Sequence, residues 1–166
     1  MDASGSMGAM ARMSAAKGAI MSLLLDAYQK RDKVAMITFN RDRGRLILPP
    51  TNSVELAGKY LSDLPVGGRT PLSSGLYETF RFLTFQNIKD PTLKKIVILI
   101  TDGRANVSLG YFDDPIKETF FNGKKSLALS LRIQNFFVVD TEKSGIMNFE
   151  MAKKLAYFFK WYSLQT

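Results

Sequence analysis

The sequence contains no cysteine and no histidine among its 166 residues. Without cysteine there is no disulfide framework, and without either residue the usual nitrogen and sulfur ligands of zinc and copper are missing. No apolar run approaches the roughly 18 residues of a membrane span, and the first residues lack the basic-then-apolar pattern of a secretion signal. These absences predict a cytoplasmic protein without a membrane segment.

Positive charge exceeds negative charge, with 23 Lys and Arg against 15 Asp and Glu and a net charge of +8. The basic residues are scattered along the chain, and their clusters are short, such as Arg41, Arg43 and Arg45. Basic and aromatic residues do not alternate as they do in proteins that bind single-stranded nucleic acid. We therefore expect no nucleic-acid partner, and the positive field favours an acidic protein partner.

Residue spacing in the first half predicts two helices around a hairpin. Apolar residues at three- and four-residue steps predict a helix from Ala11 to Arg31. Two β-rich runs, 33–39 and 44–50, are expected to pair as a hairpin, the second ended by two prolines that cannot donate to a ladder. A short helix over 53–61 follows, which Ser53 can cap.

The second half alternates helices and strands. Thr70 is expected at the N-cap and Pro71 at the first position of a helix. The run Ile96–Ile100 predicts a strand buried on both faces. The remaining expected elements are a helix over 115–134, a strand over 136–140, a helix over 148–159 and an edge strand over 161–165.

This order of elements predicts one α/β domain over residues 1–166, doubly wound, with a mostly parallel sheet flanked by helices and right-handed crossovers. Ligands of such folds bind beyond the carboxyl ends of the strands. Three segments should converge there: the loop with Asp2, Ser4 and Ser6, the loop with Thr70, and the end of the buried strand with Asp102.

These five residues offer two carboxylates and three hydroxyls, an all-oxygen set that suits Mg²⁺, or Mn²⁺, better than softer metals. The two carboxylates balance a divalent ion and leave it attractive to one more anion, for which a carboxylate of another protein is the natural ligand. Without metal the two acids would repel each other, so we expect metal affinity to fall as the pH falls.

Each part also has a purely structural interpretation. Ser4 or Ser6 can cap the following helix, Thr70 before Pro71 is a good N-cap, and Asp102 before Gly103 forms a good turn. The combination of D-x-S-x-S, a glycine-flanked threonine and T-D-G in this order favours the metal site over three independent coincidences.

This pattern resembles the metal-ion-dependent adhesion site of von Willebrand factor A domains. The resemblance implies that Ser4 and Ser6 bind the metal directly, that Asp2 and Asp102 bind directly or through water, and that Thr70 changes between the two when a partner arrives. It implies a partner's acidic residue as the last ligand. It brings no catalytic residue, so this domain alone is not expected to be an enzyme.

Six further stretches are similar to the C-terminal domain of the magnesium chelatase D-type subunit: "DASGSM", "RMSAAKGA", "AYQKRDKVAMITF", "LPVGGRTPLSSGL", "LITDGRANV" and "VVDTE". In that family the subunit works with an AAA+ ATPase subunit and a large tetrapyrrole-binding subunit to insert Mg²⁺ into protoporphyrin IX, toward chlorophyll. Cobaltochelatase-like proteins and chelatase-like proteins of unknown substrate are open alternatives.

Two features depart from that family. Arg69 stands where a third glycine usually precedes the threonine, and its charge either weakens metal binding or helps hold an incoming carboxylate. The "NGKKS" stretch lacks the first glycine of a phosphate loop, since Glu118 stands there, so we expect no ATP hydrolysis.

The family's first central strand leads directly into the first Asp, whereas here only Met1 precedes Asp2. We therefore expect a truncated domain, with Asp2 loosely held. The gap is expected to close by rearrangement, by residues 161–165, or by strand exchange between copies in a homo-oligomer.

Two other functions compete with the interaction domain. Asp2 could be the nucleophile of an aspartyl phosphoryl-transfer enzyme, although Ser4 stands where that chemistry usually needs a second acid. An adhesion-type A domain is the other, which the missing cysteines and the chelatase-like stretches disfavour.

Overall fold

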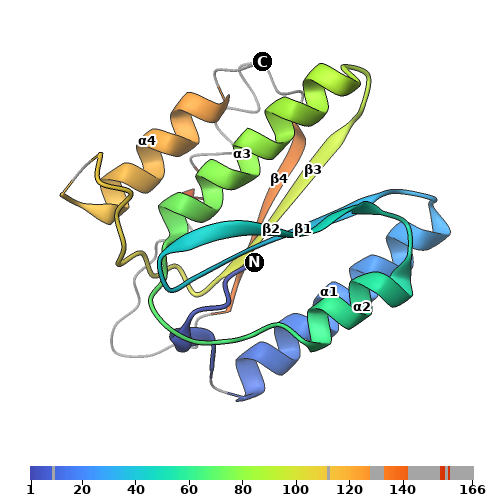
Figure 1. Ribbon diagram of the computed structural model, residues 1–166, viewed down its shortest axis with the longest axis horizontal. Helices are drawn as coiled ribbons and strands as arrows, with labels where there is room; N and C mark the ends of the chain where they lie inside the picture. Colours follow the sequence, from blue (N-terminus) through green and yellow to red (C-terminus); the bar gives the residue numbers. More distant parts are fainter. Residues whose placement is uncertain (9, 112, 128–132, 142–153, 156, 158–166) are drawn as a thin grey trace.

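The computed structural model describes residues 1–8, 10–111, 113–127, 133–141, 154–155 and 157. It confirms the predicted α/β class, with strands in the middle and helices on two sides (Figure 1). A short 3-10 helix, Gly5–Gly8, follows the first loop. The other elements are α1 Met10–Gln29, β1 Val34–Asn40, β2 Arg43–Thr51, α2 Val54–Ser62, α3 Leu72–Lys89, β3 Lys95–Thr101, α4 Pro115–Leu127 and β4 Ile133–Asp140.

The first three residues connect the two strand pairs. Strand β1 pairs antiparallel with β2, and β3 pairs parallel with β4. Between β1 and β3, the Asp2 amide donates to the Ile100 carbonyl at 2.8 Å, and the Ala3 amide donates to the Phe39 carbonyl at 3.0 Å. Met1–Ala3 therefore lies between the pairs, as the position of the N-terminus in the middle of the strands also shows (Figure 1).

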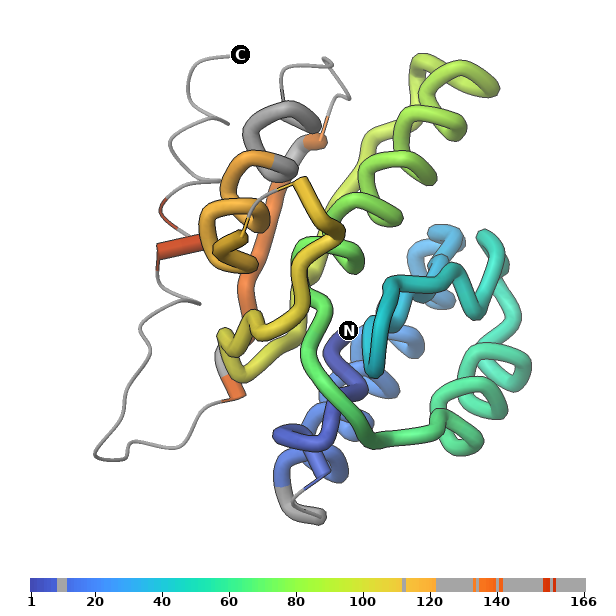
Figure 2. The backbone as a smooth tube through the Cα atoms, turned by 60° about the vertical axis from the view of Figure 1, so that its left-hand side comes forward, coloured from blue at the N-terminus to red at the C-terminus, as the bar shows by residue number. Residues whose placement is uncertain are grey.

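Two hydrophobic cores lie on opposite faces of the strands. Successive side chains of a strand point to opposite faces, so the neighbours Leu99 and Ile100 belong to different cores. One core, with Ile100 and Leu48, is covered by α1 and α2, and the other, with Leu99 and Phe80, by α3 and α4. The two helix pairs lie on either side of the strands in both views (Figures 1 and 2).

The predicted hairpin and the Ser53 cap are confirmed. The Ser53 Oγ accepts a hydrogen bond from the Leu56 amide at 3.1 Å. The two prolines do not end the second strand as expected, because β2 continues through both to Thr51. The pairing register shifts on either side of Met36, opposite this stretch, and such an irregularity accommodates residues without an amide proton.

Two predictions about the second half are wrong in detail. Helix α3 begins at Leu72 with Pro71 at the cap position and no side-chain cap. Thr70 is therefore not the N-cap; both of its backbone polar groups are bonded to Asn106 instead. The predicted helix over 115–134 is too long, because Ile133 and Gln134 already belong to β4 and extend its pairing with β3.

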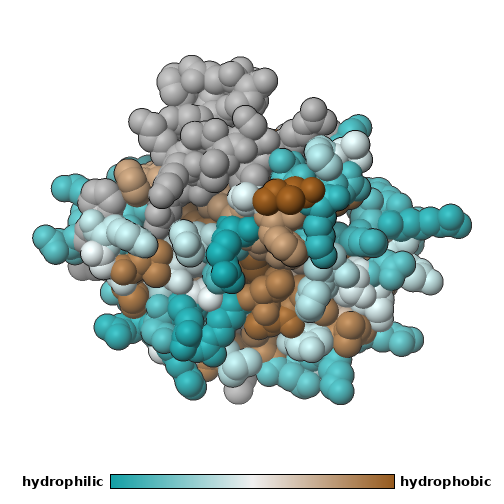
Figure 3. Space-filling view, turned by 45° about the horizontal axis from the view of Figure 1, so that its top comes forward, coloured by the Kyte–Doolittle hydropathy of each residue, from teal (hydrophilic) through white to brown (hydrophobic). Residues whose placement is uncertain are grey.

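Strand β3 is not buried on both faces along its whole length. Ile96 is 56% exposed and Ile98 is 36% exposed, whereas Ile100 on the same face is buried. Met1–Ala3 is bonded to β3 only beside Ile100 among the described residues, so the first half of this face contributes to the exposed apolar area. Apolar side chains grouped among hydrophilic ones are also visible in the space-filling view (Figure 3).

The expected C-terminal elements lie largely outside the described residues. Of the helix predicted over 148–159, only Lys154, Leu155 and Tyr157 are described, and all three are helical. The edge strand predicted over 161–165 lies outside them entirely. Within the described ranges, no helix has the length and apolar character that crossing a membrane requires.

The close approach between α3 and the hairpin leaves no room for a side chain at Gly75. A Cβ atom on Gly75 would lie 2.4 Å from Cδ1 of Phe39, whose side chain is buried. We expect Gly75→Ala to lower the free energy of unfolding by about 1–3 kcal/mol in a urea titration. Gly18→Ala is the matched control, since nothing lies within 4 Å of its Cβ. It should raise the same quantity by about 0.5–1 kcal/mol, and equal effects would contradict this packing.

Candidate metal site

The first loop folds around the carboxylate of Asp2. This residue is fully buried, and its Oδ1 accepts a hydrogen bond from the Ser4 amide at 2.9 Å. Its Oδ2 accepts from the Thr101 Oγ1 at 2.9 Å. The Ser4 and Ser6 hydroxyls lie 2.8 Å apart. The expectation of a loosely held Asp2 is wrong, because its backbone bonds to Ile100 and these side-chain bonds fix it on both sides.

The Thr70 loop is bonded to the same segment. The Gly5 amide donates to the Gly68 carbonyl at 2.8 Å, and the Gly67 amide donates to the Ala3 carbonyl at 2.9 Å. Thr70, two residues after Gly68, is buried. These bonds bring the predicted ligand Thr70 next to the loop that carries the two serines.

The loop after β3 is bonded to Thr70 in turn. The Asn106 Oδ1 accepts from the Thr70 amide at 2.7 Å, and the Asn106 amide donates to the Thr70 carbonyl at 3.2 Å. Further along, the Ser73 Oγ and the Leu109 amide both donate to Oε1 of the fully buried Glu118, each at 2.7 Å. The start of α3, this loop and α4 are therefore linked by hydrogen bonds.

Asp102 contributes an unusual oxygen atom. Its side chain is buried, and its Oδ1 accepts from the Arg104 amide at 3.2 Å. Its Oδ2 is buried and has no hydrogen-bond partner among the residues that the structure describes. The Arg104 Nε lies 3.5 Å from this oxygen, close enough for an ion pair but outside hydrogen-bonding geometry. A buried acceptor of this kind is costly, and it suits an incoming cation.

The charges of the site favour proton uptake when no metal is bound. Burial raises the pKa of Asp2 above its ordinary value of 3.8, and the nearby charge of Asp102 raises it further. Hydrogen bonds from Ser4 and Thr101 partly oppose this rise in pKa. Two buried carboxylates this close together are stabilised by a divalent cation, which removes the repulsion.

The donor set fits a hard divalent cation. Asp2, Asp102 and the paired serine hydroxyls supply oxygen ligands only, which Mg²⁺ and Mn²⁺ prefer. No cluster of three Asp, Glu, His or Cys residues occurs in the described ranges. A metal at this site would therefore depend on the two acids and on hydroxyls or water.

Comparisons with known proteins identify the family of this fold. A family model described as "von Willebrand factor type A domain" matches residues 1–104. The chain belongs to the von Willebrand factor A family. The BatB protein of Bacteroides thetaiotaomicron shares the fold, with a TM-score of 0.56, 16% identity, and 98% of this chain and 96% of that one covered.

Curated relatives of this A domain include magnesium-chelatase subunits. An uncharacterized protein of Methanocaldococcus jannaschii is 42% identical over 96% of this chain and 90% of its own length. The "Magnesium-chelatase 67 kDa subunit" of Chlorobaculum tepidum is 41% identical over 93% of this chain. The match covers only 26% of that subunit, so the chain spans about a quarter of it.

Three residues of this A domain's site were not predicted to have roles there. Thr101 donates to Asp2, Asn106 holds Thr70, and Arg104 lies against Asp102. All three belong to the "TDGRAN" stretch, and a threonine ending a buried strand was the one available signal for Thr101. The partner of Asn106 depends on how a separate loop approaches, and the position of Arg104 depends on the conformation of its own loop; spacing along the chain specifies neither.

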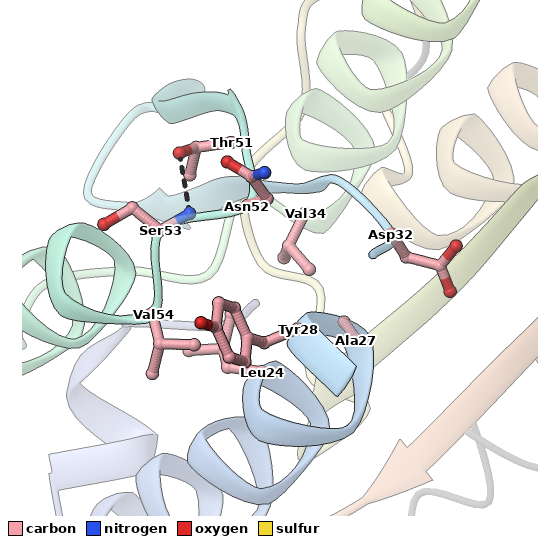
Figure 4. A pocket seen from close by; sticks show the side chains of 9 residues that line it. All are labelled: Leu24, Ala27, Tyr28, Asp32, Val34, Thr51, Asn52, Ser53 and Val54. Carbon is pink, nitrogen blue, oxygen red and sulfur yellow. Dashed lines mark hydrogen bonds between the residues drawn. The ribbon is translucent and has the colours of Figure 1, made fainter. Parts of the chain in front are cut away.

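A hollow lies away from this site, between the end of α1 and the start of α2 (Figure 4). Leu24, Tyr28 and Val54 line much of it. The polar groups of Ser53 at its edge are already used, since its amide donates to the Thr51 Oγ1 and its Oγ caps α2. Asp32 and Asn52 also line the hollow, so its lining is mixed, polar on one side and apolar on the other.

Replacing Thr101 by valine should destabilise the metal-free protein by about 1–3 kcal/mol at pH 7, because a buried oxygen of Asp2 loses its hydroxyl partner. The pKa of Asp2 is raised in the folded state, so ionised Asp2 weakens the fold. That cost is absent below pH 3.8, the ordinary pKa, and complete above the raised folded-state pKa.

The loss of unfolding free energy caused by Thr101→Val should therefore become smaller as the pH falls from above the raised pKa of Asp2 toward 3.8. Urea unfolding at a series of pH values measures it. Thr84→Val is the control, because the Thr84 hydroxyl donates only to the Phe80 carbonyl within α3. A loss that stays constant with pH would show that Thr101 does not stabilise the charge of Asp2.

Proposed function

We propose that this chain is a non-catalytic, metal-dependent interaction domain of a magnesium-chelatase-like subunit. In this proposal Mg²⁺, or Mn²⁺, binds between Asp2 and Asp102 and docks an acidic segment of a partner. The observation that carries the proposal is the buried, unbonded Oδ2 of Asp102 close to a second buried carboxylate. Such a pair is unfavourable for the fold alone and favourable for a cation.

Each residue of the site has a distinct part in the proposal. Asp2 and Asp102 supply the negative charge, and Ser4 and Ser6 supply neutral hydroxyl oxygens. Thr70 lies on the adjoining loop and binds directly or through water. When bound, the metal supplies an electrophilic centre for a carboxylate. The chain's own contribution is to hold these oxygens in place and keep the acids out of water, and no residue here is assigned a chemical step.

The partners follow from the similarity to magnesium-chelatase subunits. We assign the acidic segment to an AAA+ ATPase subunit or a large tetrapyrrole-binding subunit of a chelatase complex in the cytoplasm. The similarity extends over 93% of this chain and not merely over the metal motif. A cobaltochelatase-like complex would use the same docking chemistry with a different tetrapyrrole.

Calorimetric titration with Mg²⁺ and Mn²⁺ tests the site. We expect Asp102→Asn to weaken binding about 10-fold or more, because the amide removes the charge while keeping the shape. Asp26→Asn is the control, since Asp26 is exposed and pairs with Lys30 on α1. An acidic peptide should bind only when the metal is present. Equal metal affinities of wild type and Asp102→Asn would overturn the assignment.

Metal affinity should also fall from pH 7 to pH 5. The pKa of Asp2 is raised by burial and by the charge of Asp102, so protons compete with the metal at a higher pH than for an ordinary aspartate. The same titration repeated across this range measures the effect. An affinity that does not change would show that these carboxylates are not the ligands.

A further inference from the structure

Arg104 places a positive charge beside the proposed cation position. Its Nε lies 3.5 Å from the Asp102 Oδ2, and its side chain is 46% exposed. A charge-assisted hydrogen bond would be about 2.7–2.9 Å long. The guanidinium is therefore close enough to offset the charge of the buried carboxylate, but it makes no hydrogen bond to Oδ2.

We propose that Arg104 substitutes for the divalent cation when the site is empty and binds the acidic partner when the cation is present. This inference rests on the proposed function, because it concerns the same carboxylate. It gives one residue two effects: Arg104 lowers the affinity for the metal and raises the affinity for the acidic partner.

The competition between Arg104 and the metal follows from charge. A divalent cation on Asp102 takes over the negative charge that Arg104 shares, and it repels the guanidinium at short range. Part of the attraction between Arg104 and Asp102 is thus lost when metal binds. Removing the arginine should then strengthen metal binding, the opposite of the effect expected from a residue that merely supports the loop.

Two further arginines lie on or beside the Thr70 loop, which adjoins the same site. Arg69 directly precedes Thr70 and is exposed. Arg41, also exposed, packs against Gly68, where a Cβ atom would lie 2.7 Å from the Arg41 Cγ. Neither Arg41 nor Arg69 forms an ion pair within the part of the chain that the structure describes.

These three arginines, here called the arginine rim (Arg41, Arg69 and Arg104), indicate the chemistry of the partner. One carboxylate on the metal does not offset the positive charge of these three side chains. A segment with further acidic residues beside the metal-binding one pairs with them as well. The rim therefore favours a partner segment with several carboxylates over one with a single acid.

The test measures two affinities for each variant by calorimetry: Mg²⁺ alone, and acidic peptides at saturating Mg²⁺. One peptide carries a central Asp flanked by Ala, and the other carries the same Asp flanked by Glu. For Arg104→Ala we expect Mg²⁺ to bind roughly two- to fivefold more tightly and the Glu-flanked peptide to bind more weakly by a similar factor. Binding of the Ala-flanked peptide should change less.

Arg81→Ala is the matched control, because it removes one positive charge from an exposed position on α3. It should leave both affinities close to those of wild type. Arg104→Gln keeps most of the side-chain length and should repeat both changes of Arg104→Ala, and melting temperatures verify that the variants are folded.

The outcomes separate this inference from the function on which it rests. If wild type binds no Mg²⁺, the proposed function fails. If wild type binds Mg²⁺ but both Arg104 variants bind it equally well or more weakly, the substitution of arginine for metal is overturned. If the two peptides lose affinity equally, the preference for several carboxylates is wrong.

Discussion

The hydrogen bonds of Met1–Ala3 hold the two strand pairs together. With the Asp2 amide on Ile100 and the Ala3 amide on Phe39, a three-residue segment joins β1 to β3. Each of those strands carries residues of both hydrophobic cores, so the join also aligns the cores. The same backbone presents the Asp2 side chain, and the geometry of the site therefore depends directly on the geometry of the sheet.

The buried carboxylates are a stability cost that the fold sustains at this position. Asp2 and Asp102 are both buried, and within the described part of the chain one oxygen of Asp102 has no hydrogen-bond partner. Buried charges are tolerated where function requires them, and the surrounding structure must then be rigid enough to keep them in place. Here hydrogen bonds from Ser4 and Thr101 hold the Asp2 side chain, and a hydrogen bond from the Arg104 amide holds that of Asp102.

The sequence predicted correctly those elements that depend on residues close together in the chain. The apolar spacing of α1, the turn between β1 and β2, and the Ser53 cap each depend on residues close together in the chain. The predicted role of Thr70 as an N-cap was wrong because Asn106, 36 residues away, bonds its backbone. The burial of β3 was overestimated because an apolar run does not show how much of the strand other segments cover, and Ile96 and Ile98 are exposed. The motif likewise indicated which loops converge, but not that Arg104 would lie against Asp102.

The hydrogen bonds of Asn106 and Glu118 join three segments: the start of α3, the loop after β3, and α4. Asn106 is hydrogen-bonded to both backbone polar groups of Thr70, and the Glu118 carboxylate accepts hydrogen bonds from Ser73 and Leu109. The loop that carries Asp102 is therefore bonded to the residues at the start of α3 and, through Glu118, to α4. A cation held at the proposed site would therefore lie against a loop that is hydrogen-bonded to the start of one helix and to the side chain of another.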